Sequence, residues 1–142
     1  MRALLDVNVL ISLLDAAHVH HTRARQWLEA NIAHGWASCP ITENGCVRIL
    51  SQPRYPRQTP LAEAAARLRE AQATPWHAFW PDGISMLDAE RIRLDRMYGP
   101  TQVTDSYLLA LAVAHGGRLV TFDRNVNLAS VPAATERNLF TI

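Results

Sequence analysis

The sequence predicts a single α/β domain in which a central, mostly parallel, twisted sheet is flanked by helices in three layers. Short apolar runs of the kind found in buried strands alternate with longer runs of helical periodicity, which is the pattern of α/β folds. The chain of 142 residues has the length of one domain, and no internal repeat or long linker divides it. Its 49% hydrophobic and 19% charged residues are typical of a globular protein. We therefore expect residues 1–142 to form one domain.

The first half of the chain predicts two strands, three helices and a loop. Continuous apolar runs suggest strands buried on both faces of a parallel sheet, and apolar residues at helical spacing suggest amphipathic helices. Pro40 ends the second strand before the third helix begins. The strands are expected at residues 2–6 and 36–39, the helices at residues 8–14, 20–32 and 42–50, and a loop with two prolines at residues 51–57.

The second half continues the alternation of helices and strands. Gly116 and Gly117 are placed to end a strong helix with a left-handed cap, because glycine adopts that conformation without steric cost. The helices are expected at residues 61–73, 87–97 and 104–115, the strands at residues 76–80 and 118–122, and a final edge strand at residues 139–142.

Four acidic residues stand where this pattern gathers side chains at one place. Asp6 and Asp123 end predicted strands, whereas Glu43 and Asp105 begin predicted helices. In an open parallel sheet, the carboxyl ends of the strands and the first turns of the helices share one edge, where ligands bind. We therefore expect these four residues to form one acidic site and to be the catalytic residues.

Helical spacing predicts that Glu43 and Asp105 point inward with the apolar residues that follow them, and not toward water. A single acid in the first turn of a helix has a simpler explanation, because the helix dipole stabilises it by about 0.3–1 kcal/mol. Capping alone does not explain four acids at one edge. Two like charges about 4 Å apart repel by about 4 kcal/mol at an effective dielectric constant near 20.

Such a cluster requires cations, and the composition points to a hard metal ion. The 14 basic residues are all arginine, so no lysine is available to neutralise the site. Oxygen ligands favour Mg²⁺ or Mn²⁺, whereas zinc would call for histidine or cysteine. We expect Asp6 and Asp105 to bind the metal directly, and Glu43 and Asp123 to bind a second ion or to position water. The number of ions stays open.

Polar neighbours of the acids are candidates for supporting roles, as holders of outer-shell water or orienters of the ligands. These are Asn8, Thr104, Thr121 and Ser106. Two arginines are candidates for contact with RNA or with an acidic partner. Arg48 follows Glu43 by about one helical turn, and Arg124 comes directly after Asp123.

Four segments, in order along the chain, resemble the motifs of one known family. Residues 4–11 read Leu-Leu-Asp-Val-Asn-Val-Leu-Ile, and residues 42–45 read Thr-Glu-Asn-Gly. Residues 104–112 read Thr-Asp-Ser-Tyr-Leu-Leu-Ala-Leu-Ala, and residues 121–124 read Thr-Phe-Asp-Arg. The set resembles the PIN-domain ribonucleases, and most closely the VapC toxins of toxin–antitoxin pairs.

This resemblance implies an activity, a site and partners. The activity is that of a Mg²⁺- or Mn²⁺-dependent endoribonuclease that cuts RNA such as tRNA or rRNA and arrests growth. The family's acids fall on Asp6, Glu43, Asp105 and Asp123, and its polar helper falls on Asn8. The resemblance also implies a homodimer that is silenced by a cognate VapB antitoxin, whose tail enters the active-site groove.

Two other classes of function compete with the enzyme. A catalytically inactive PIN-like module would bind RNA or a protein without cleaving anything. A phosphoacceptor signalling domain also clusters acids at strand ends, but it requires a lysine that this chain lacks. No apolar stretch reaches the roughly 18 residues of a membrane helix, and an acid interrupts the start of the chain before a signal-peptide core can form. We expect a cytoplasmic protein without a membrane segment, with Cys39 and Cys46 as buried thiols.

Overall fold

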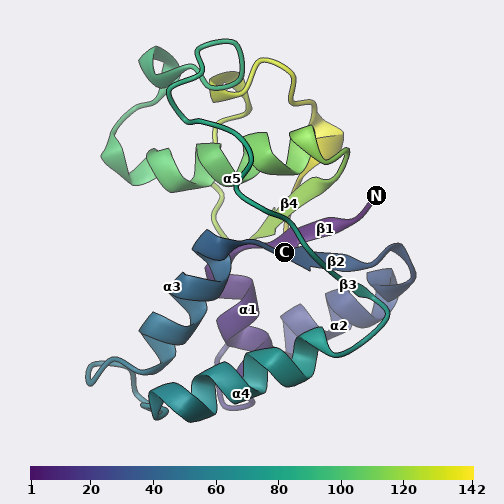
Figure 1. Ribbon diagram of the computed structural model, residues 1–142, viewed down its shortest axis with the longest axis vertical. Helices are drawn as coiled ribbons and strands as arrows, with labels where there is room; N and C mark the ends of the chain where they lie inside the picture. Colours follow the sequence, from purple (N-terminus) through teal and green to yellow (C-terminus); the bar gives the residue numbers. More distant parts are fainter.

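A five-stranded sheet forms the centre of the computed structural model, which describes residues 1–142 (Figure 1). The strand order is β3-β2-β1-β4-β5, and every neighbouring pair is parallel. β1 therefore lies in the middle, between β2 and β4. The strands are β1 (Ala3–Leu5), β2 (Trp36–Ser38), β3 (His77–Phe79), β4 (Arg118–Thr121) and β5 (Leu139–Thr141).

Helices cover both faces of the sheet and make the expected three layers. In Figure 1, α5 lies on one face of the sheet with the irregular segments around it, whereas α1, α2, α3 and α4 lie on the opposite face, which we call the four-helix face. The strand residues alternate between two cores: Leu4 packs with the α5 residues, whereas Ala3 and Leu5 pack with the residues of α1, α3 and α4. The α-helices are α1 (Val7–Leu14), α2 (His21–Asn31), α3 (Pro40–Leu50), α4 (Leu61–Gln72) and α5 (Val103–Ala114).

The structure confirms the predicted single α/β layer architecture and nearly all of its elements. The sheet is parallel throughout, because the last strand, β5, also pairs in parallel with β4. Gly116 has a φ of 67°, which is the left-handed conformation expected at the end of α5. Cys39 and Cys46 are buried free thiols, as expected, and burial raises the pKa of Cys46 to about 12.

The helix predicted at residues 87–97 is wrong. Only a 3₁₀ turn at Leu94–Arg96 forms there, within a long irregular segment. Leu87 and Leu94 are 79% and 45% exposed, so their spacing of seven residues does not mark a buried stripe. The Asp88 carboxylate accepts a hydrogen bond from the Glu90 amide, which favours a turn over a helix.

An ion pair between a buried aspartate and an exposed arginine, which the sequence reasoning missed, fixes the loop between α3 and α4. Asp15, which follows α1, is 5% exposed and accepts hydrogen bonds from the Tyr55 hydroxyl and from Arg57 Nε. Although burial opposes ionisation, the hydrogen bonds from Tyr55 and Arg57 lower the pKa of Asp15. The loop of residues 51–59 is thereby attached to the end of α1.

None of the helices combines the length and the hydropathy that a bilayer crossing requires.

Candidate active site

Asp6 lies at the carboxyl end of the central strand, where it caps the N-terminus of α1. Its Oδ1 accepts a hydrogen bond from the Val7 amide at 2.7 Å, and its Oδ2 accepts one from the Thr121 hydroxyl at 2.6 Å. The Asp6 amide in turn donates to the Val120 carbonyl. Asp6 is only 7% exposed, so β1 and β4 together hold a buried carboxylate in one orientation.

Asp105 and Asp123 lie next to Asp6, as the sequence predicted. Burial, the negative charges of Asp6 and Asp123, and a hydrogen bond with Asp123 raise the pKa of Asp105 to about 6. Burial also raises the pKa of Asp6, with a further contribution from the charge of Asp123 and against the hydrogen bonds from Thr121 and Val7. The Asp123 amide donates to the Thr121 hydroxyl oxygen at 3.0 Å. One threonine therefore orients both strand-end acids.

No basic side chain neutralises these three aspartates. The five salt bridges of the structure lie elsewhere, and none includes Asp6, Asp105 or Asp123. Burial and the charges of Asp6 and Asp123 raise the pKa of Asp105, and burial together with the charge of Asp123 raises that of Asp6, because a negative charge disfavours ionisation of its neighbour. A divalent cation would supply the missing positive charge beside the three aspartates. Carboxylate oxygens are the ligands that Mg²⁺ and Mn²⁺ prefer.

The site fits an ion with a partly aqueous shell better than a closed set of protein ligands. No three acidic, histidine or cysteine side chains are placed to coordinate one ion by themselves. Mg²⁺ usually keeps several waters and is bound through one or two carboxylates together with substrate phosphate oxygens. The three aspartates fit that mode of binding.

Glu43 is the acid that the structure does not bring into the cluster. Its Oε1 accepts hydrogen bonds from the Ser38 hydroxyl at 2.8 Å and from Gln72 Nε2 at 2.6 Å. These contacts hold it against β2 and α4. Glu43 does share a helix face with apolar residues, as predicted, but that face packs toward α4 instead of toward Asp6.

A groove begins at Asp6 and follows α3. It has a volume of about 490 Å³, and Asn44, Arg48 and Thr104 contribute its polar lining beside Asp6. Arg48 is exposed and belongs to none of the salt bridges. The acidic cluster therefore lies at the end of a groove that presents an arginine able to bind an anion.

The other sequence candidates take different places. Asn8 contacts Thr121 and Phe122 through its side-chain amide, at 3.4 and 3.5 Å, so it lies beside the strand end as expected. Arg124 is exposed next to Asp123. Ser106 is fully buried and hydrogen-bonds to Ser130, which removes it from the site.

Sequence reasoning missed the residues that hold Glu43. Ser38 and His77 lie on adjacent strands, with Ser38 Oγ 2.8 Å from His77 Nε2, and Gln72 ends α4. One signal was present: Ser38 is a polar residue within a predicted strand whose other residues are apolar. The contribution of Gln72 depends on how α4 packs on α3, which local sequence patterns do not encode.

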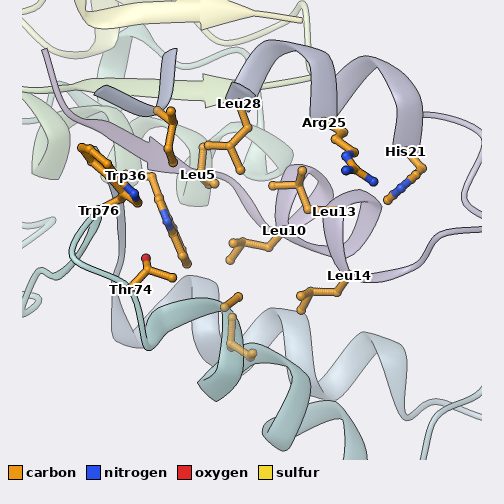
Figure 2. A pocket seen from close by; sticks show the side chains of 13 residues that line it. Leu5, Leu10, Leu13, Leu14, His21, Arg25, Leu28, Trp36, Thr74 and Trp76 are labelled. Atoms are coloured by element: carbon orange, nitrogen blue, oxygen red, sulfur yellow. The ribbon is translucent and has the colours of Figure 1, made fainter. Parts of the chain in front are cut away.

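A second hollow, of about 360 Å³ and mostly apolar, lies on the four-helix face (Figure 2). Figure 2 shows Leu10, Leu13 and Leu28 pointing into it, with Arg25 and His21 at one end. It is formed by α1, α2, α4 and the strands above them. Its lining has no acidic residue and no feature of a catalytic site; it offers a binding place for apolar side chains.

The family model and the curated relatives that match this chain agree on one family. The family model described as "PIN domain" matches residues 3–132. Ribonuclease VapC44 of Mycobacterium tuberculosis is 55% identical over 142 residues, which covers 100% of both chains. Ribonuclease VapC38 of the same species is 42% identical over 142 residues and covers 99% of each chain.

Solved structures support the fold. The crystal structure of VapBC2 from Rickettsia felis, bound to a DNA fragment from its promoter, contains a chain that matches with a TM-score of 0.65. The identity is 13%, and the match covers 99% of this chain and 98% of that one. VapC20 of Mycobacterium tuberculosis, a toxin that cleaves the sarcin–ricin loop, matches with a TM-score of 0.58 and 17% identity, over 93% and 98% of the two chains.

Proposed function

We propose, from the premise that this chain belongs to the PIN-domain family and to its VapC ribonucleases, that it is the toxin of a VapBC pair and a divalent-metal-dependent endoribonuclease. Its reaction is hydrolysis of phosphodiester bonds in RNA, with tRNA or rRNA as the substrate class. The site of action is the cytoplasm, where these RNAs are found.

The single observation that carries this proposal is the group of three aspartates without a cationic partner. Asp6 follows β1, Asp105 lies in α5 and Asp123 follows β4, yet they lie close enough that the charges of Asp6 and Asp123 contribute to the raised pKa of Asp105, and the charge of Asp123 to that of Asp6. A fold that maintains such repulsion needs a positively charged ligand to relieve it. Mg²⁺ or Mn²⁺, held by these carboxylates and water, is that ligand in our proposal.

When bound, a divalent ion polarises the phosphodiester and lowers the pKa of a bound water. The residues of the chain have separate tasks. Asp6 and Asp105 are the proposed direct ligands, and Asp123 binds the ion or positions the attacking water. Thr121 fixes the orientation of Asp6 through its hydroxyl, and Asn8 supports Thr121. Arg48 and Thr104, which line the groove, contact the RNA strand next to the scissile phosphate.

A VapB-type antitoxin is the proposed protein partner. Arg48 and Arg124 are exposed beside the aspartates, so an acidic segment of the antitoxin can pair with them and block the groove. The apolar hollow among α1, α2 and α4 accepts the apolar face of an antitoxin helix, in the common helix-in-groove mode.

We also propose that the toxin is a homodimer. Light scattering of the purified protein tests this proposal by measuring its molar mass in solution.

The proposal is tested by replacing each of two carboxylates with its uncharged isostere. Asp6→Asn and Asp105→Asn are expected to reduce cleavage of end-labelled tRNA and rRNA at least about 100-fold, because a metal ligand or its charge is lost. Wild-type protein should cleave with Mg²⁺ or Mn²⁺ and should be inactive in excess chelator. Asp95→Asn, at an exposed acid outside the site, is the matched control and should retain full activity.

The same experiment separates the enzyme from the inactive binding module. Wild-type protein that binds RNA tightly but cleaves none with either metal would support the binding module and contradict the nuclease. Cleavage that persists in Asp105→Asn at the wild-type rate would remove that residue from the proposed site.

A further inference from the structure

We propose that Tyr98 binds the RNA substrate of this nuclease by stacking on a base beside the scissile phosphate, and that Gln102 is the residue that positions Tyr98. Both residues belong to the segment that leads into α5, and the sequence patterns single out neither of them. This inference rests on the proposed function, because it concerns which part of the RNA the nuclease contacts next to its aspartates.

Tyr98 is a solvent-exposed ring on an anchored backbone. Its side chain is 89% exposed, more than that of any other large apolar residue in the chain. The preceding residue, Met97, packs against the α5 core. The Tyr98 amide donates a hydrogen bond at 2.8 Å to Oε1 of Gln102, which is only 8% exposed. A base that stacks on this ring therefore has little backbone motion to restrict, which favours binding.

A chain of hydrogen bonds connects Tyr98 to the aspartate cluster. Gln102 accepts from the Tyr98 amide and donates through Nε2 to the Asn125 carbonyl at 2.9 Å. The Asn125 amide in turn donates to Asp123 Oδ1 at 2.7 Å. The side chain of Gln102 thus holds the segment of Tyr98 against the loop that contains Asp123.

The sheet topology places this loop and the α3 groove on opposite sides of Asp6. Asp6 follows β1, which lies between β2 and β4. The groove that Arg48 lines runs along α3, the helix after β2. Gln102 instead contacts the loop after β4. An RNA strand that is bound in the groove and passes over the aspartates therefore continues toward Tyr98.

The charge beside Tyr98 also suits RNA. Arg124 lies between Asp123 and Asn125 in the loop that Gln102 contacts, and it is exposed and belongs to no salt bridge. Proteins that bind single-stranded RNA combine basic side chains, which contact phosphates, with aromatic rings on which bases stack. Unpaired bases of RNA loops are the groups that such rings recognise. The exposed ring and the free guanidinium together favour an unpaired base as the ligand of Tyr98.

The first experiment compares the cleavage kinetics of Tyr98→Ala and Tyr98→Phe. Tyr98→Ala should raise KM on a cleavable RNA about tenfold and change kcat less than about twofold, because stacking contributes before and during the reaction alike. Tyr98→Phe keeps the ring, so its KM should stay within about twofold of wild type. Leu87→Ala removes another exposed apolar side chain from the same irregular segment and is the matched control. All three variants should keep the melting temperature of wild type, since they change exposed side chains.

A second experiment isolates stacking from other contacts. Fluorescence anisotropy in excess chelator measures the affinity for a short, labelled single-stranded RNA of mixed sequence and for an RNA of the same length made only of abasic residues. Tyr98→Ala should weaken binding of the first RNA about tenfold and leave the affinity for the abasic RNA unchanged. An equal loss of affinity for both RNAs, or no loss for either, would overturn the stacking role.

A double-mutant cycle tests whether Gln102 acts through Tyr98. Gln102→Leu removes both hydrogen bonds of the amide at a similar side-chain size, and it should raise KM by about the same factor as Tyr98→Ala. Tyr98→Ala should then have little further effect on KM in the Gln102→Leu background. Gln102 would have a structural role alone if its loss lowered the melting temperature and the two effects on KM multiplied, and its positioning role would be overturned.

Failure of this inference can be told apart from failure of the proposed function. If Asp105→Asn abolishes cleavage while Tyr98→Ala keeps both the KM and the RNA affinity of wild type, the nuclease stands and the inference is wrong. If wild-type protein cleaves no RNA with Mg²⁺ or Mn²⁺, the proposed function is wrong. The anisotropy comparison, which needs neither metal nor cleavage, then still decides whether Tyr98 stacks on RNA.

Discussion

At the scale of the residue, the aspartate cluster makes stability depend on pH in an unusual direction. The pKa of Asp105 is raised to about 6, from 3.8 in its unperturbed state. Between these two values the folded protein holds a proton that the unfolded chain releases. The contribution of Asp105 to stability is therefore fully present below about pH 4, and it is lost as the pH rises through about 6.

We predict that, in excess chelator, Asp105→Asn is more stable than wild type at pH 7.5, because the variant has no charge to bury. The expected rise in melting temperature is about 2–4 °C, and it should vanish near pH 4. Addition of Mg²⁺ should reverse the order, since an ion that binds only the folded wild type stabilises it. Thermal unfolding at the two pH values, with and without Mg²⁺, checks this. Equal melting temperatures in chelator at pH 7.5 would contradict it.

The proximity of Asp6, Asp105 and Asp123 could be predicted from the sequence for a clear reason. Asp6 and Asp123 follow strands, and the position of a strand end fixes where the next residue lies. Asp105 lies in the first turn of α5, which packs on the same side of the sheet as the acids at the strand ends. Glu43 also begins a helix, but the direction of its side chain depends on the rotation of α3 against α4. Helical periodicity predicts a buried face without saying which neighbour covers it.

At the scale of the element, the contact between α1 and α3 is set by a single glycine. A Cβ at residue 45 would lie 2.7 and 3.2 Å from the two methyl carbons of Val7, in the first turn of α1. We predict that Gly45→Ala lowers the free energy of unfolding by about 1–3 kcal/mol, as overpacking usually does. Urea unfolding measures the change.

A compensating variant serves as the control for this prediction. Val7→Ala removes both methyl carbons, so the double variant should recover most of the stability that Gly45→Ala loses relative to Val7→Ala alone. Additive losses in the double variant would mean that the contact with Val7 is not the cause.

Most elements were predictable because their sequence patterns agree with their final environment. The segment at residues 87–97 was not, since it has apolar residues at helical spacing but makes turns instead. Its backbone hydrogen bonds depend on a distant part of the chain: the Arg93 amide donates to the Ser130 carbonyl. A pattern within eleven residues does not contain that partner.

At the scale of the whole molecule, the two hollows lie apart and predict separable functions. The groove along α3 borders the aspartates, while the apolar hollow lies among α1, α2 and α4. Both the parallel sheet and its layers were predictable from the order of the elements. The apolar hollow was not, because it exists only between helices that local sequence does not place relative to one another.

We predict that Leu13→Glu, in the apolar hollow, weakens binding of the cognate VapB-type antitoxin at least about tenfold and leaves RNA cleavage intact. A charge in an apolar site is costly to desolvate. Leu87→Glu is the control, because Leu87 is 79% exposed and far along the chain from the hollow. Copurification and calorimetry measure binding. Wild-type affinity in Leu13→Glu would exclude the hollow as the antitoxin site.

The central position of β1 has a consequence for synthesis on the ribosome. Asp6 is among the first residues to be synthesised, but the hydroxyl that orients it belongs to Thr121, near the other end of the chain. The strand β4, which pairs with β1, is also synthesised late. A nascent chain therefore contains Asp6 long before the active site is complete. A nuclease with this fold therefore completes its active site only when translation of its own message is nearly finished.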